Sequence, residues 1–353
     1  MGRHGFRLAA ALATVIVTGW TTPVAAGADE GSYWLSGPYA HDNLAVYLIH
    51  REDADDGPVP LTLDEAMQQG LIEVVETGVV EELIVRNTGD SEVFLQSGDI
   101  FKGGKQDRVL IASMIVPPGS GDLSVDVFCV ESGRWSARDG ETAAWFSQST
   151  ARLPSRDGRI ALFKEAQRWF APESDRAAWL DGEDLQSQVW ESVSVMQADL
   201  GSAMVLEVAD ERSPSSLQLS LENADLAAAL ERYESNLGSL AQGHRDAVGY
   251  VFAINGRIAG GDEFANGGLF RKLWTRQLTA AATEAIAEKD VLARDEPTLV
   301  EIGAFVDTAR TGEAAGMSMP GEMILETRET DQVLHTELLR LDGLLVHRSL
   351  VAY

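Results

Sequence analysis

Short apolar segments separated by turn residues dominate the chain between residues 33 and 140. The segments are rich in Val and Ile and lie at residues 44–49, 82–85, 93–95, 109–116 and 123–130. The turn signals between them are Thr88-Gly89-Asp90, Gly103-Gly104 and Pro117-Pro118-Gly119. Such runs are typical of strands in an antiparallel arrangement. The pattern predicts a strand-rich lobe over residues 33–140, built as an antiparallel β-sandwich or barrel, with one helix between Thr62 and Gly70.

Apolar residues change to a helical spacing beyond residue 140. One stripe consists of Leu185, Val189, Val193, Met196 and Leu200. A second stripe follows Asn223, a favourable N-cap, and consists of Leu226, Leu230, Tyr233, Leu237 and Leu240. A third consists of Phe270, Trp274, Leu278, Ala281 and Ala285. Residues three and four apart share one face of a helix, so each stripe predicts an amphipathic helix packed on a core.

Two hairpins are predicted in the same half of the chain. Asn255-Gly256 favours a type I′ turn, and Asp342-Gly343 marks a second turn. The second turn sets Leu339 opposite Val346 and Glu337 opposite Arg348. His335 and His347 then lie on opposite faces, which argues against a shared metal site. We expect an α+β fold in which the first lobe packs against a helical and mixed α/β lobe over residues 141–353, as one composite domain.

The first 26 residues have the features of a secretory signal. Arg3 and Arg7 precede the apolar run 8–17, and small residues follow up to Ala26 and Ala28, either of which is a plausible cleavage point. The run is shorter than the roughly 20 residues that span a bilayer. We therefore expect an exported protein, periplasmic or extracellular, with no membrane span after residues 1–26 are removed.

The charge balance excludes one class of partner. The 353 residues include 28 Lys and Arg against 55 Asp and Glu, for a net charge of −27. Binding nucleic acid requires clustered cations, so we expect no nucleic-acid partner. The single cysteine, Cys129, allows no internal disulfide, and its alternation with Val125 and Val127 favours a buried thiol over a nucleophile. His and Cys spacings typical of zinc sites are missing, so no metal or other cofactor is expected.

The densest group of cations, Lys102, Lys105 and Arg108, surrounds the glycine pair Gly103-Gly104. A phosphate-loop reading of this segment fails, because Gln106 follows Lys105 where Ser or Thr is needed. Three cations beside flexible backbone amides still suit an anionic group. The alternative is a hairpin turn whose cations offset an acidic surface. The expected ligand-binding residues are Lys102, Gly103, Gly104, Lys105, Gln106, Arg108, Arg134 and Trp135.

Two other readings remain open at this stage. A hydrolase of nucleotide-sugar or phosphoryl substrates would use Glu131 or Glu263 as a general base, provided that its pKa is raised in a cleft shared with the cations. A glycan- or cell-wall-binding module would use a group of tryptophans, although core packing is the simpler explanation for them. The tryptophans are Trp135, Trp145, Trp169, Trp179 and Trp190.

Several segments resemble one known family, the ARG and rhodanese-phosphatase-superfamily-associated protein domain. The specific ones are Gly-Gly-Lys-Gln-Asp-Arg at 103–108 and Cys-Val-Glu-Ser-Gly-Arg-Trp at 129–135, and Val-Pro-Pro-Gly-Ser at 116–120 lies between them. Weaker matches bring the resemblance to roughly residues 35–290, and Phe101 and Lys102 depart from the pattern. The family name records association with ADP-ribosylglycohydrolase and phosphatase-like proteins, so the resemblance implies no reaction and no catalytic residues. We therefore expect an uncharacterised exported protein that binds an anionic small molecule or a protein partner.

Overall fold

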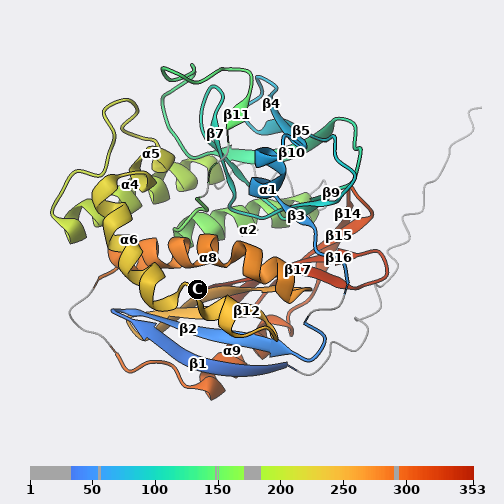
Figure 1. The fold of residues 1–353 in the computed structure, drawn as a ribbon, viewed down its shortest axis with the longest axis vertical. Coiled ribbons are helices and arrows are strands. Elements are labelled where there is room, and N and C mark those ends of the chain that lie inside the picture. The colour runs from blue at the N-terminus through green and yellow to red at the C-terminus, as the bar shows by residue number, and fades with distance from the viewer. Residues whose placement is uncertain (1–32, 55–56, 148, 150, 171–183, 290–293) are drawn as a thin grey trace, which may run out of the picture.

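A large antiparallel sheet joins the two ends of the chain in the computed structural model, which describes residues 33–353 except 55–56, 148, 150, 171–183 and 290–293. Its eight strands follow the order β1-β2-β12-β13-β17-β16-β15-β14 (Figure 1). The strands are β1 (Tyr33–His41), β2 (Leu44–Arg51), β12 (Ala247–Ile254), β13 (Arg257–Phe264), β14 (Ala315–Met319), β15 (Met323–Glu329), β16 (Val333–Arg340) and β17 (Leu345–Ala352). Strand β2 therefore pairs with β12, which lies about 200 residues later, and β1 forms the edge beside β2.

The sequence of strand β2 is continuously apolar because both faces of the strand are buried. Leu44, Val46 and Leu48 face the main core, whereas the alternate residues Ala45, Tyr47 and Ile49 face a second core. Helix α8 (Gly267–Ala287) covers the first face of this part of the sheet, and α9 (Leu299–Ala309) covers the other (Figure 1). A strand buried on both faces loses the usual alternation of apolar and polar residues.

Two smaller sheets lie on the far side of α8 from the large sheet (Figure 1). The six-stranded sheet follows the order β11 (Phe146–Ser147), β7 (Ile100–Gly103), β8 (Arg108–Leu110), β10 (Leu123–Cys129), β5 (Glu82–Asn87) and β4 (Ile72–Glu76). The three-stranded sheet follows the order β3 (Leu61–Thr62), β6 (Val93–Leu95) and β9 (Met114–Val116). The prediction of one strand over residues 109–116 is wrong, because the chain passes there from one sheet to the other.

The predicted helices are confirmed, except that the helix predicted to run through Leu240 ends at Leu237, and Leu240 begins a separate short helix. They are α1 (Leu63–Gln68), α4 (Leu185–Met204), α6 (Ala224–Leu237) and α8, and the structure adds α2 (Arg156–Phe170), α5 (Leu217–Leu221) and α7 (Leu240–Gly243). Thr62 and Glu65 form a capping box at the start of α1, and Asn223 caps α6. Every residue of the stripes on α4 and α8 is buried. The apolar spacing therefore located the core-facing sides of these helices.

Both predicted hairpins are present, with one correction. Asn255 and Gly256 have φ angles of 51° and 72°, as a type I′ turn requires. Glu337 pairs with Arg348 as predicted, but Leu339 pairs with Leu345 and not with Val346, because an irregularity between residues 338 and 339 shifts the register.

The separation of the two histidines is also confirmed. Nδ1 of His335 lies 2.6 Å from the carbonyl of Ala309, whereas Nε2 of His347 lies 3.0 Å from Asp262. The two rings therefore serve different parts of the core.

The fold is α+β, as the pattern of elements predicted. The boundary between lobes at residue 140 stays a prediction, and sheet membership does not follow it, since β1 and β2 join the strands of the C-terminal half. Within the described residues, we find no helix that combines the length and the apolar character needed to cross a membrane.

Candidate functional site

The predicted cation-rich segment forms the β7–β8 hairpin. Gly103 and Gly104 have φ angles of 113° and 55°, which favour glycine, and a side chain at Gly104 would collide with the ring of Phe146. Both glycines are buried, and the amide of Gly103 donates to Asp107. The tight turn therefore serves packing, and its Gly103 amide is already bonded within the protein.

The cations of this segment have three different surroundings. Arg108 is fully buried, donates to the carbonyl of Gln106 at 2.8 Å and lies 3.5 Å from Glu76. Lys102 forms a 2.5 Å ion pair with Glu222. The ammonium of Lys105 lies 4.9 Å from the ring centre of Trp135, which is 46% exposed. Lys105 and Trp135 are the pair that reaches the surface.

Glu131 is the centre of a buried ionic cluster. Arg134 binds its carboxylate with both Nε and Nη2, at 2.6 and 2.5 Å, and the Ser213 hydroxyl and the Asp107 amide also donate to it. Burial alone would raise the pKa of Glu131, but the bonds from Arg134 and Ser213 outweigh it and lower that pKa. A paired carboxylate with a lowered pKa is poorly suited to act as a general base.

The other two candidate groups are held in a similar way. Glu263 is buried and accepts a 2.5 Å bond from Arg348. The thiol of Cys129 is fully buried and donates to the side-chain oxygen of Gln106 at 3.1 Å. Burial raises the pKa of Cys129 to about 11, which favours the buried structural thiol over a nucleophile.

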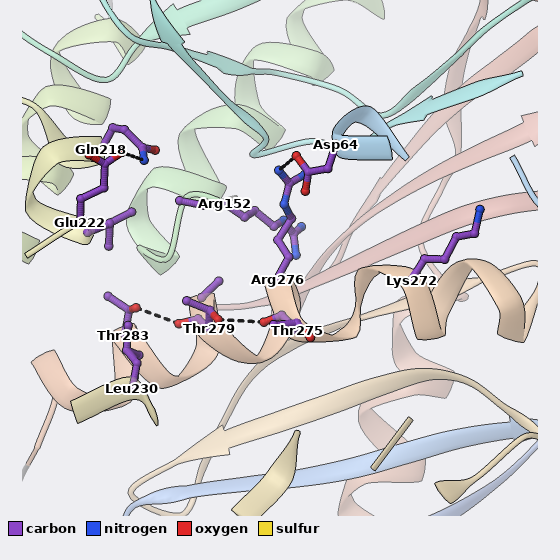
Figure 2. Close-up of a pocket in the computed structure, with 13 residues that line it drawn as sticks. Asp64, Arg152, Gln218, Glu222, Leu230, Lys272, Thr275, Arg276, Thr279 and Thr283 are labelled. Atoms are coloured by element: carbon purple, nitrogen blue, oxygen red, sulfur yellow. Dashed lines mark hydrogen bonds and ion pairs between the residues drawn. The ribbon is translucent and has the colours of Figure 1, made fainter. Parts of the chain in front are cut away.

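A cavity of about 260 Å³ lies beside α8, outside this cluster (Figure 2). One wall is α8 itself, and α5, α6 and α1 supply residues around it. Figure 2 shows Thr275, Thr279 and Thr283 in a row along α8, with Arg152 and Arg276 above them. The remaining lining residues are Asp64, Ala151, Gln218, Leu221, Glu222, Leu230, Lys272 and Ala280.

The two arginines are fixed by buried partners. Arg276 donates to Asp99 at 2.7 Å, to Asp64 at 3.0 Å and to the carbonyl of Ser149. Arg152 lies 2.7 Å from Asp262. Asp99 immediately precedes β7, and Lys102 on β7 pairs with Glu222 on the cavity wall. The β7–β8 hairpin therefore does not line the cavity, although it is bonded to residues that do. Of the predicted binding residues, Lys102 makes such a bond, through its ion pair with Glu222.

The threonine row gives the cavity hydrogen-bonding acceptors. The hydroxyl of Thr279 donates to the carbonyl of Thr275 at 2.9 Å, and that of Thr283 donates to the carbonyl of Thr279 at 2.8 Å. The hydroxyl protons of Thr279 and Thr283 are therefore bonded within the helix, and the lone pairs of both oxygens remain available to accept hydrogen bonds. Leu221, Leu230 and Ala280 add apolar surface. The lining therefore suits a small polar molecule with an apolar face.

The sequence interpretation missed this row because it followed only the apolar stripe of α8. Thr275, Thr279 and Thr283 are spaced four apart, as are Lys272 and Arg276. That spacing places them together on the side of the helix that the apolar stripe does not occupy. A polar stripe of this kind was the available signal.

A Ser-His-Asp arrangement also occurs in the core, and its Asp262 is the partner of Arg152. His347 Nδ1 lies 3.0 Å from the Ser113 hydroxyl, and Nε2 lies 3.0 Å from Asp262. All three side chains are almost completely buried. A nucleophile must reach its substrate, so we interpret this group as a structural network that links the large sheet to the smaller sheets.

Comparison with known families identifies the chain. The ARG and Rhodanese-Phosphatase-superfamily-associated Protein domain matches residues 32–351, nearly the whole sequence. The chain belongs to this family. The match extends well beyond the residues 35–290 that carried the resemblance, and it includes all strands of the large sheet. Neither a curated protein nor a solved structure matches the chain.

The ARG and Rhodanese-Phosphatase-superfamily-associated Protein domain has no known function, so membership supplies neither an activity nor a set of catalytic residues. It does place the β7–β8 hairpin, the Glu131 cluster and the cavity beside α8 within a single family unit. Function must therefore be argued from the geometry of this chain.

Proposed function

We propose that this protein is exported and binds a small hydroxylated molecule with an anionic group in the cavity beside α8. The observation that carries the proposal is the lining of that cavity, in which a row of threonine oxygens faces fixed arginines. A volume of about 260 Å³ is close to the lower end of small-ligand sites, so the ligand is no larger than a monosaccharide derivative.

Lys272 supports an anionic group on the ligand. Three cationic side chains, Arg152, Lys272 and Arg276, line the cavity, and buried acids already pair with both arginines, so Lys272 is the lining cation that an anionic group can recruit. The Lys272 ammonium is exposed and pairs with Glu65 at 2.8 Å. An exposed ion pair is worth little, so a carboxylate or phosphate entering the cavity can replace Glu65 at small cost.

The threonine row supports hydroxyl groups on the same ligand. Oxygens whose own protons are engaged act as acceptors, and a polyol supplies donors to them. Sugar acids and sugar phosphates combine both features.

A matched ligand panel tests this proposal. Thermal unfolding is measured with D-glucuronate and glucose 6-phosphate, with glucose as the uncharged analogue and inorganic phosphate as the charge alone. We expect the charged sugars to raise the unfolding temperature more than either control, because only they contact both the cationic side chains and the threonine oxygens of the lining. A panel in which no charged sugar exceeds its controls would contradict the proposal.

Export is a separate part of the proposal, supported by the pattern of residues 1–26. Full-length protein is expressed in a Gram-negative host, and the mass of the mature chain is measured in periplasmic and cytoplasmic fractions. We expect a periplasmic product that begins at Gly27 or Asp29. A product that keeps Met1 and stays in the cytoplasm would refute export.

Glycan binding is a second candidate, favoured by two exposed tryptophans. Trp135 and Trp145 are 46% and 44% exposed, and both flank the Gly103–Lys105 turn. Exposed indole rings stack on sugar faces. Binding to insoluble peptidoglycan or chitin that is lost in Trp135→Ala, but retained in Thr279→Leu, would favour this second function over the cavity.

A further inference from the structure

Two histidines and an aspartate gather at one end of the large sheet, and none of them lines the cavity. His50 is on β2, His244 follows α7, and Asp246 precedes β12. One ligand atom from each residue lies within 4.8 Å of the others. We propose that these three residues bind a transition-metal ion of the zinc type.

The backbone holds the three residues together. The amide of Arg51 donates to the carbonyl of Asp246 at 3.0 Å, and the amide of Ala247 donates to the carbonyl of His244 at 3.1 Å. Ala247 lies directly opposite His50 in the β2–β12 pairing. The cluster is therefore built by the sheet and the turn that enters it, and it does not depend on flexible side chains alone.

His50 presents a buried nitrogen with no hydrogen bond. Its side chain is almost completely buried, and Nδ1 has no hydrogen-bond partner among the described residues. This atom lies 3.2 Å from Oδ1 of Asp246. Two ligands of a tetrahedral zinc ion are separated by about 3.3 Å, given metal–ligand distances of about 2.0 Å. An ion would occupy the otherwise unused acceptor position of this nitrogen.

A hydroxyl group lies at Nε2 of each ring. The Ser36 hydroxyl lies 2.7 Å from Nε2 of His50, and the Tyr39 hydroxyl lies 3.2 Å from Nε2 of His244. When both oxygens accept from Nε2–H, the lone pair of each imidazole is on Nδ1. Metal-binding histidines usually have such a partner on the second nitrogen, because it fixes the ring and its tautomer.

The surroundings allow an ion to enter and favour a cation. Asp246 is about half exposed, and His244 is partly exposed. The ring of Trp34, 43% exposed, stacks on His50 at 5.5 Å. The protein carries a net charge of −27, which attracts cations from solution. Two imidazoles and one carboxylate favour zinc-type ions over Mg²⁺ or Ca²⁺, and three protein ligands leave a fourth position open.

Calorimetric titration of the untagged, chelator-treated protein with Zn²⁺ tests this site. We expect one ion per chain. The affinity should be at least about 100-fold lower in His244→Ala and in Asp246→Asn, because loss of a group that only hydrogen-bonds to a metal ligand already costs about 10- to 100-fold in metal affinity. Tyr39→Phe should fall in that smaller range. Titration with Mg²⁺ should give no saturable binding.

His41→Ala is the matched control, because His41 lies at the other end of the β1–β2 pairing from His50 and contacts Tyr233. We expect its affinity to equal that of the wild-type protein. Circular dichroism of each variant verifies that it is folded, and the Co²⁺-bound visible spectrum reports ligation independently of affinity. Absence of saturable Zn²⁺ binding by the wild-type protein, or unchanged affinity in either His244→Ala or Asp246→Asn, would overturn the proposal.

Discussion

The role of Arg134 depends on which group its guanidinium binds in the folded protein. Beside Trp135, and three residues after Glu131, it suits either an anionic ligand or a structural pair with that carboxylate, and in the structure its guanidinium binds Glu131. Arg108 is likewise buried against Glu76. Sequence position reports that cations are near each other, but it does not report which acids fold onto them. The pairing partner decides whether a cation is available to a ligand.

Glu284 carries the clearest pH dependence at the residue level. It is buried on α8, bonds Arg159 at 2.8 Å and accepts from the amide of Arg156 at the start of α2. Burial raises the pKa of Glu284 from 4.5 to about 7, although Arg159 opposes the rise. The folded state then holds a proton that the unfolded state has released, so this group's stabilisation is complete below pH 4.5 and is lost as the pH rises through 7.

We therefore expect Glu284→Gln to be less sensitive to pH than the wild-type protein. The difference in unfolding free energy between the two should grow from pH 5 to pH 8 by up to about 3 kcal/mol in favour of the variant. Urea unfolding at both pH values measures this difference, and Glu191→Gln, an exposed change on α4, should leave the wild-type dependence intact. Equal pH dependence in wild type and Glu284→Gln would contradict the assignment.

At the scale of elements, local signals predicted what local contacts determine. The Thr62 cap, the apolar stripes of α4 and α8 and the Asn255-Gly256 turn all depend on neighbours in the chain, and all are confirmed. The β2–β12 pairing and the Arg276–Asp99 bond depend on contacts across about 200 and 177 residues. A single sequence contains no signal for such pairings, so the grouping of His50 with His244 and Asp246, and the walls of the cavity opposite α8, were not predicted.

The two β-turns differ in a way that substitution can measure. Gly256 and Gly343 both have positive φ angles, 72° and 85°. A side chain at Gly256 would lie 2.6 Å from the carbonyl oxygen of Asp295, whereas one at Gly343 would meet no atom within 4 Å. We expect Gly343→Ala to cost about 1 kcal/mol through backbone strain alone, and Gly256→Ala to cost at least about 2 kcal/mol because overlap is added. Chemical unfolding of both variants measures the costs, and equal losses would contradict this interpretation.

At the scale of the whole molecule, the acidic surplus acts on stability. The net charge is −27, and the excess carboxylates repel one another in the folded state. Salt screens that repulsion, because the Debye length falls from about 10 Å at 0.1 M to about 3 Å at 1 M. We expect the unfolding temperature to rise between these concentrations of NaCl. Choline chloride should give a similar rise if ionic strength is the cause. A fall in unfolding temperature in both salts would show that attractive ion pairs outweigh the repulsion.

The central claim is that the cavity beside α8 binds a small hydroxylated anion. Calorimetric titration with D-glucuronate tests it most directly when three proteins are compared. Thr279→Leu fills the cavity, whereas Thr311→Leu makes the same change at an exposed threonine after α9, whose hydroxyl also donates to a backbone carbonyl. We predict saturable binding by the wild-type protein and by Thr311→Leu, and at least about 10-fold weaker binding by Thr279→Leu. Binding that is unaffected by Thr279→Leu, or absent from the wild-type protein, would contradict the claim.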